Sequence, residues 1–162
     1  MKQPTYSNGT RLEALVIKDN KILVIKRFHK NNKYFVLPRG GWKSPETFED
    51  GVAREVMEET SIDVKVDRLV FDLVVKNDSR KVVYLCEYIK GEPILGDFNE
   101  KASMKNNSND TYKPIWLPIS KLNSTKLYTL EFRDWFLENY YNKKLPNKPK
   151  KLAITTDMFR RN

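Results

Sequence analysis

The sequence holds 162 residues, which is the usual size of one domain built around one core. With 40% hydrophobic and 31% charged residues, it has the composition of a globular protein and not of a disordered or fibrous one. The formal net charge is +9, but residues 143–162 contribute +6 of it. The charge therefore does not by itself indicate a nucleic-acid-binding domain. We expect a single domain over residues 1–142, followed by a basic tail over residues 143–162.

The kinds of residue present also limit the chemistry. No apolar run approaches the roughly 18 to 20 residues that span a bilayer, and residues 1–10 lack the apolar core of a signal peptide, so we expect a cytoplasmic protein. The single cysteine, Cys86, lies in an alternating run that predicts a buried strand position. The single histidine, His29, lies in a polar stretch that predicts a surface loop. A metal in this chain must be held by oxygen ligands, which favours magnesium, manganese or calcium over zinc.

The first elements in chain order are predicted to be strands. Residues 11–18 and 21–27 are rich in β-branched residues, and the polar pair Asp19-Asn20 between them predicts a two-residue hairpin. A short apolar run at residues 34–37 precedes the glycine pair Gly40-Gly41, which predicts a strand that ends in a glycine turn.

From Thr47 onward, hydrophobic residues recur with the spacing of an α-helix, and Thr47 is the expected N-cap. We expect the helix to end near Thr60-Ser61. Its expected apolar stripe consists of Phe48, Val52 and Val56, with Ala53 and Met57 beside them.

The rest of the chain continues this alternation of strands and helices. We expect a bent strand at 64–75, a strand at 81–89, a long polar loop at 96–110, a strand at 112–117, a helical turn at 119–122 and an amphipathic helix at 128–141. Antiparallel strands with one helix in the middle and one near the end predict an α+β fold.

Three glutamates on the first helix carry the strongest chemical signal. Glu55, Glu58 and Glu59 stand at positions i, i+3 and i+4, so they project from one part of the helix surface, opposite the apolar stripe. Like charges at this spacing repel by about 0.2 to 0.5 kcal/mol per pair, and a bound cation would reverse the sign. A solvated acidic face is the alternative interpretation. The basic composition of the chain and the glycine pair shortly before the helix favour a metal site.

The segment from Gly40 to Ile62 resembles the signature of the Nudix hydrolase family. That signature is glycine, five residues, glutamate, seven residues, then Arg-Glu-apolar-any-Glu-Glu-any-Gly-apolar, and every spaced position matches except the second glycine, which is Ser61. Lys43 and Pro45 also replace the commoner acid and glycine of the loop. The resemblance reaches roughly from residue 11 to residue 141. It implies an α/β/α sandwich with a mixed, largely antiparallel central sheet.

The resemblance also implies roles for individual residues. Glu58 and Glu59 would bind the metal, which is magnesium or, alternatively, manganese. Arg54 would orient the carboxylates, and Glu46 would support the metal site. Glu55 would be a further ligand or the general base, and the backbone carbonyl near Gly40 would be another ligand. Outside the signature, the base is expected to be Glu100, with Asp97 as the alternative.

The implied reaction is metal-dependent hydrolysis of a pyrophosphate bond in a small nucleotide-like substrate, a nucleoside diphosphate linked to another group. Arg39 is expected to grip a phosphate, and Trp42 and Phe98 are expected to contact the substrate. The alternatives are a hydrolase of dinucleoside or diphosphoinositol polyphosphates, a hydrolase of RNA 5′ ends, and a catalytically weakened binding module. The protein is expected to be a monomer or a homodimer.

Overall fold

The computed structural model describes residues 9–75, 79–95, 110–142 and 144–154. Its elements in chain order are β1 (Thr10–Lys18), β2 (Lys21–His29), β3 (Asn32–Val36), β4 (Arg39–Gly41), α1 (Phe48–Thr60), β5 (Asp63–Val75), β6 (Ser79–Lys90), β7 (Thr111–Pro118), the 3-10 helix η1 (Ile119–Ser124), β8 (Leu127–Tyr128), α3 (Leu130–Tyr141) and β9 (Lys150–Ile154). The predicted strands and helices are thus present, in the predicted order.

The hairpin between β1 and β2 joins two halves of the sheet. Asp19 and Asn20 both have left-handed backbone conformations, with φ of 50° and 59°, as a tight two-residue hairpin turn requires. The two strands pair only at Ile17 with Ile22 and at Lys18 with Lys21. Beyond these pairs β1 lies beside β6, whereas β2 lies between β3 and β7.

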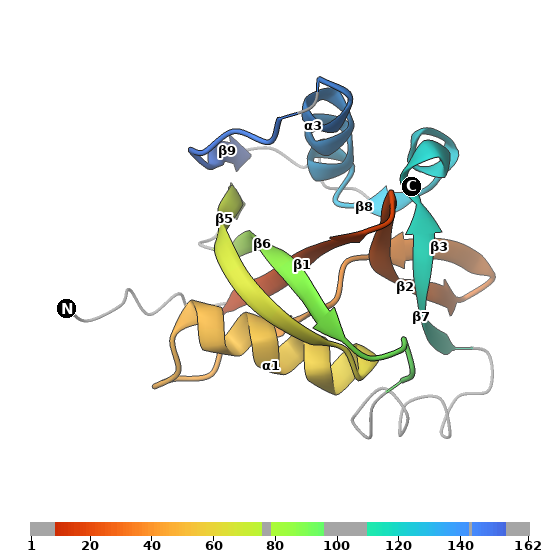
Figure 1. Ribbon diagram of the computed structural model, residues 1–162, viewed down its shortest axis with the longest axis horizontal. Coiled ribbons are helices and arrows are strands. Elements are labelled where there is room, and N and C mark those ends of the chain that lie inside the picture. The colour runs from red at the N-terminus through yellow and green to blue at the C-terminus, as the bar shows by residue number, and fades with distance from the viewer. Residues whose placement is uncertain (1–8, 76–78, 96–109, 143, 155–162) are drawn as a thin grey trace.

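The two helices cover opposite faces of the sheet (Figure 1). Val52 and Val56 of α1 pack in one apolar cluster with alternate residues of β1, which are Leu12, Ala14 and Val16. Phe132 and Phe136 of α3 pack in a second cluster with Leu15, the β1 residue whose side chain has the opposite direction. Parallel pairings join β1 to β6, β3 to β8 and β5 to β9, and the other described pairings are antiparallel. The predicted α/β/α sandwich with a mixed sheet is confirmed.

Three local predictions need correction. The glycine pair does not form a turn after a strand, because Arg39–Gly41 is itself a short strand that pairs with β1. His29 does not lie in a surface loop, because β2 extends to it and its Nδ1 lies 2.6 Å from Oδ1 of Asp110. The last predicted helix begins at Leu130 and not at residue 128, because Leu127–Tyr128 pairs with β3 as β8. The predicted bend in β5 is present as irregular register against β6.

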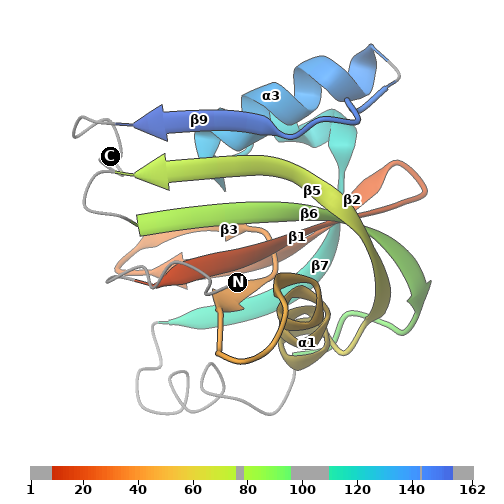
Figure 2. The ribbon, with the colours of Figure 1, turned by 90° about the vertical axis from the view of Figure 1, so that its left-hand side faces the viewer.

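The basic segment after residue 142 is not entirely a tail. β9 lies parallel to β5 at the edge of the sheet (Figure 2). Leu145 and Leu152 pack against the apolar cluster under α3. The fold therefore extends past the expected domain boundary. Among the described residues, no helix has both the length and the apolar character needed to cross a membrane.

Cys86 lies in β6 with only 2% of its surface exposed, as the alternation predicted. Burial raises the pKa of its thiol to about 12. Because the thiolate is the reactive form, we expect Cys86 to react with a disulfide reagent such as DTNB at pH 8 only after unfolding. Absorbance of the released thionitrobenzoate, with and without denaturant, measures this. Rapid reaction of the folded protein would contradict the buried position.

Candidate active site

Helix α1 begins where the sequence predicts it. Thr47 has extended backbone geometry, and its hydroxyl oxygen accepts a hydrogen bond of 3.0 Å from the backbone N–H of Asp50. Glu49 and Asp50 lie in the first turn, where negative charge stabilises the helix dipole. This cap fixes the start of the helix and therefore the positions of the glutamates near its end.

Ser61 ends α1 in the left-handed conformation, with φ of 61°. Its backbone N–H donates to the Met57 carbonyl at 3.0 Å, and its hydroxyl donates to the Ile94 carbonyl at 2.9 Å. The left-handed conformation costs a non-glycine residue about 1 to 2 kcal/mol. The hydroxyl contact offsets part of this cost, so serine occupies the position of the family glycine without disturbing the end of the helix.

This arrangement predicts a difference between two substitutions of Ser61. Ser61→Gly removes the backbone strain and the hydroxyl contact together, so its free energy of unfolding is expected to stay within about 1 kcal/mol of the wild-type value. Ser61→Ala removes only the hydrogen bond and is expected to lose about 0.5 to 1.5 kcal/mol. Urea unfolding measures both. Equal stability of Ser61→Ala and the wild-type protein would show that the Ile94 contact contributes nothing.

The glutamate face of α1 is not fully solvated. Glu55 and Glu59 are each only 8% exposed, whereas Met57, which was expected in the apolar stripe, is 45% exposed. The helix packs on the sheet through Val52 and Val56, and this orientation turns Met57 outward. The same orientation places Glu55 and Glu59 against β4, where Glu55 contacts Gly40 and Glu59 contacts Arg39.

Arg54 connects three carboxylates at the centre of the site. Its Nε and Nη2 donate to the two oxygens of Glu46 at 2.9 and 2.7 Å. Its Nη1 donates to Glu55 at 2.7 Å and to Glu58 at 3.2 Å. A planar guanidinium can serve several carboxylates at once because its donors are rigidly arranged.

The carboxyl groups bound to Arg54 differ in acidity. The hydrogen bond from Arg54 lowers the pKa of Glu46. Burial raises the pKa of Glu55 in spite of the same guanidinium. Their opposite shifts follow from their different exposure to solvent, because burial penalises the charged form. The hydrogen bond with Glu46 raises the pKa of Arg54 further, so Arg54 stays cationic.

Gly40 brings the backbone of β4 against Glu55. A Cβ atom built on Gly40 would lie 2.0 Å from the carboxyl carbon of Glu55 and 2.1 and 2.2 Å from its oxygens. Glycine is therefore required for the close approach and not for a special backbone angle. The approach places the backbone of β4 beside a buried carboxylate.

The neighbouring predicted substrate residues are engaged within the protein. The backbone N–H of Arg39 donates to Oε2 of Glu59 at 3.3 Å, and its guanidinium lies 3.6 Å from the buried carboxylate of Glu13. The indole N–H of Trp42 donates to the Glu46 carbonyl at 2.8 Å, and its ring packs against Phe48. Trp42 thus anchors the loop before α1. Phe98, Asp97 and Glu100 lie outside the described residues.

The donors around Gly40 are of the kind that a hard cation binds. Among the described residues, no three histidine, cysteine, aspartate or glutamate side chains converge as a ready-made metal cluster. Arg54 takes one oxygen of Glu55 and one of Glu58, and a carboxylate offers a second oxygen. The Gly40 approach also leaves no Cβ between Glu55 and the β4 backbone. Oxygen donors of this kind suit a hard divalent ion that keeps several waters.

A pocket of about 270 Å³ lies beside Gly40 and Glu59. Its other lining residues are Arg11, Ile25, Arg27, Val36, Arg39 and Tyr112. No sequence pattern predicted that Arg11, Arg27 and Tyr112 belong to one site, because they lie in three different strands. Only the pairing of β2 with β7 reveals that Arg27 and Tyr112 are neighbours.

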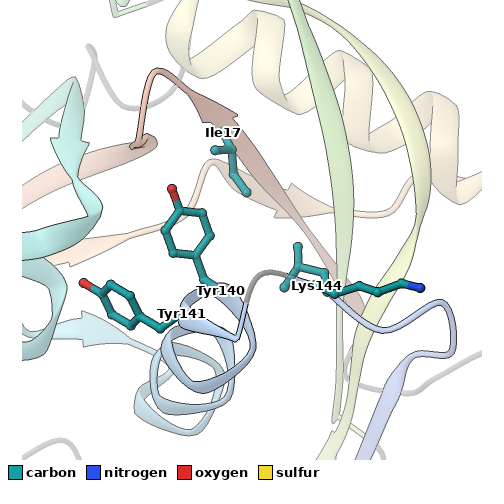
Figure 3. A pocket seen from close by; sticks show the side chains of 5 residues that line it. Ile17, Tyr140, Tyr141 and Lys144 are labelled. Atoms are coloured by element: carbon teal, nitrogen blue, oxygen red, sulfur yellow. The ribbon is translucent and has the colours of Figure 1, made fainter.

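A second pocket, of about 510 Å³, lies at the C-terminal end of α3 (Figure 3). It is lined by Ile17, Tyr140, Tyr141, Lys144 and Leu145. None of these residues belongs to α1 or β4, so this pocket is not part of the site around Arg54.

The glutamates of α1 that contact Arg54, and the close approach of Gly40 to Glu55, lie within the part of the chain that matches a known family. The chain belongs to the NUDIX domain family, whose model matches residues 11–136.

Individual relatives agree with this assignment. The chain is 36% identical over 99 residues to an ADP-ribose pyrophosphatase of Methanocaldococcus jannaschii, a match that covers 56% of this chain and 57% of that protein. It is 38% identical over 91 residues to a MutT-like protein of Streptomyces ambofaciens, covering 52% of this chain and 56% of that protein. The matches thus span just over half the length of these curated relatives. A NUDIX hydrolase structure from Nitrosomonas europaea shares the fold, with a TM-score of 0.71 at 14% identity over 91% of this chain and 79% of that chain.

Proposed function

We propose that this protein is a metal-dependent hydrolase that cleaves a pyrophosphate bond in a nucleoside diphosphate linked to another group. The observation that carries the proposal is the contact of one arginine, Arg54, with Glu46, Glu55 and Glu58 beside the close approach of Gly40. The name of the Methanocaldococcus jannaschii relative makes ADP-ribose the first substrate to test.

In this proposal the metal ligands are Glu58, Glu59 and the backbone carbonyl near Gly40, Glu55 is a further ligand or the general base, and the ion is Mg²⁺ or Mn²⁺. A divalent ion bound there supplies an acidified water and neutralises charge on the phosphates. Arg54 holds Glu55 and Glu58 in fixed orientations, and Glu46 holds Arg54 from the other side. Outer partners of this kind usually change metal affinity or activity about 10- to 100-fold when they are removed.

Glu55 is the described residue best suited to accept a proton from water. Its carboxyl group lies at the centre of the site, where burial raises its pKa and Arg54 donates to one of its oxygens at 2.7 Å. Glu100 and Asp97 remain the alternative bases proposed from the sequence. Ser61 gives no support to a catalytically weakened module, because it keeps the left-handed end of α1.

The test of this proposal is a panel of ADP-ribose, nucleotide sugars, nucleoside di- and triphosphates, dinucleoside polyphosphates and capped RNA. Each is incubated with the protein in Mg²⁺ or in EDTA, and phosphorylated products are separated by ion-exchange chromatography. We expect release of a phosphorylated nucleotide from at least one small substrate, only when metal is present. Glu138→Gln on α3 is the matched control and should keep the wild-type rate. Absence of metal-dependent cleavage across the panel would refute the proposed reaction.

A further inference from the structure

The pocket beside Gly40 is strongly basic for its size. Three arginines line it, namely Arg11 of β1, Arg27 of β2 and Arg39 of β4, against one acid, Glu59 of α1. It borders the metal-binding residues proposed above only through Gly40 and Glu59. Its strand residues therefore form a surface for a different part of a ligand.

Arg27 is held between two tyrosines on neighbouring strands. It pairs in register with Tyr34 of β3 and with Tyr112 of β7. Its Cζ lies 3.6 Å from the ring centroid of Tyr112 and 5.7 Å from that of Tyr34. A guanidinium contacts an aromatic ring with its flat face. Its N–H donors lie in the plane of the group, so the ring contact does not use them.

The donors of Arg27 have no acceptor in the described part of the chain. Its Nε is buried and makes no hydrogen bond there, and no described carboxylate forms a salt bridge with it. Arg27 as a whole is half-buried, but a buried N–H donor without an acceptor is costly unless a ligand supplies one. An arginine placed in this way indicates an anionic ligand.

The other two arginines have different surroundings. Arg39 is 9% exposed, and Glu13 lies behind it at 3.6 Å, so part of its charge is offset within the protein. Arg11 is exposed at the rim and lies opposite Gly41 in the pairing of β1 with β4. Half-buried Arg27 and exposed Arg11 thus both line the pocket, whereas the charge of Arg39 is partly offset by Glu13.

We propose that Arg27, with Arg11, forms a subsite for a phosphate group of the substrate. A stacked base is the poorer occupant, because Arg27 already covers the ring of Tyr112. A guanidinium and a phosphate form paired, charge-assisted hydrogen bonds. The inference rests on the proposed function for the nature of the substrate. The phosphate is either one of the two joined by the scissile bond or a third one.

Binding of inorganic tripolyphosphate in EDTA tests the subsite without any catalysis. Isothermal titration calorimetry should show that Arg27→Gln binds tripolyphosphate about 10- to 100-fold more weakly than the wild-type protein, the loss expected for one or two charged hydrogen bonds. Arg27→Lys keeps the charge but not the planar donors, and should be intermediate. Arg133→Gln on α3 removes the same charge elsewhere and should bind like the wild-type protein.

The outcome that overturns the subsite is binding by folded Arg27→Gln within twofold of the wild-type value. Thermal melting verifies folding, and if Arg27→Gln is unfolded, Arg27→Lys serves for the same comparison. Loss of hydrolysis on every substrate with Arg27-dependent tripolyphosphate binding would refute the proposed reaction but leave the subsite standing. Metal-dependent hydrolysis together with tripolyphosphate binding that does not depend on Arg27 would refute the subsite but leave the proposed reaction standing.

Substrate pairs distinguish the two sources of the phosphate. If Arg27→Gln raises KM for a nucleoside triphosphate but not for ADP-ribose, the subsite holds a third phosphate. If it raises KM equally for both, the subsite holds a phosphate of the scissile pair. Unchanged KM for both substrates would overturn the assignment of Arg27 to a phosphate of the substrate.

Discussion

Replacing Gly40 by alanine is expected to reduce hydrolysis about 100-fold while leaving the protein folded. The new Cβ would lie 2.0 to 2.2 Å from the carboxyl atoms of Glu55, so that carboxylate must move. The carboxylate is the end of a flexible side chain and can rotate away, which limits the effect on folding. It would then leave its hydrogen bond of 2.7 Å to Arg54. Initial rates in Mg²⁺ and thermal melting measure the two effects separately.

Gly41→Ala is the matched control, because a Cβ at Gly41 has no atom within 4 Å. Neither glycine has a positive φ, so alanine is compatible with both backbones. We expect Gly41→Ala to keep most of the activity. Equal rates for Gly40→Ala and Gly41→Ala would contradict the importance of the contact between β4 and Glu55.

Arg54→Lys is expected to raise the Mg²⁺ concentration needed for half-maximal activity about 10- to 100-fold. Lysine keeps the charge but has one donor group in place of the planar fork that reaches Glu46, Glu55 and Glu58. Loss of these partners leaves the largely buried Glu55 unsatisfied, so we expect the free energy of unfolding to fall by about 1 to 3 kcal/mol. Rates over a Mg²⁺ titration and urea unfolding measure the two changes.

Arg80→Lys is the control that separates a loss of stability from a change in the Mg²⁺ requirement. Arg80 likewise donates two hydrogen bonds to a carboxylate, that of Asp72, at 2.9 and 2.8 Å, and this pair lies outside the candidate site. This variant should lose stability and keep the wild-type Mg²⁺ requirement. If both arginine variants shift the requirement equally, the effect of Arg54 comes from general destabilisation and not from orientation of the glutamates.

Local patterns were sufficient to predict most of the fold. The cap at Thr47, the helix end at Ser61 and the Asp19-Asn20 turn depend on residues that are close in sequence, and all three are present. The spacing of the glutamates likewise predicted a common region of α1 for them. It did not predict the burial of Glu55 and Glu59, because burial depends on which side of α1 meets the sheet.

Features that depend on pairing between distant strands could not be predicted from local sequence patterns. β4 and β9 were missed because a strand of three or five residues is defined mainly by its partner. The grouping of Arg27 with Tyr34 and Tyr112 follows from the register of β2 with β3 and β7. Arg39, which the sequence analysis expected to grip a phosphate, lines the pocket, and no local pattern predicted that Glu13 would be its neighbour.

Direct binding of Mn²⁺, followed by the loss of the free-ion signal in electron paramagnetic resonance, tests the central claim without knowledge of the substrate. The wild-type protein is expected to bind Mn²⁺ in competition with Mg²⁺, and Glu58→Gln is expected to bind it more weakly. Glu138→Gln, on the exposed side of α3, should match the wild-type protein. Equal Mn²⁺ binding by the wild-type protein and Glu58→Gln, or no binding by either, would contradict a metal site built on the glutamates of α1.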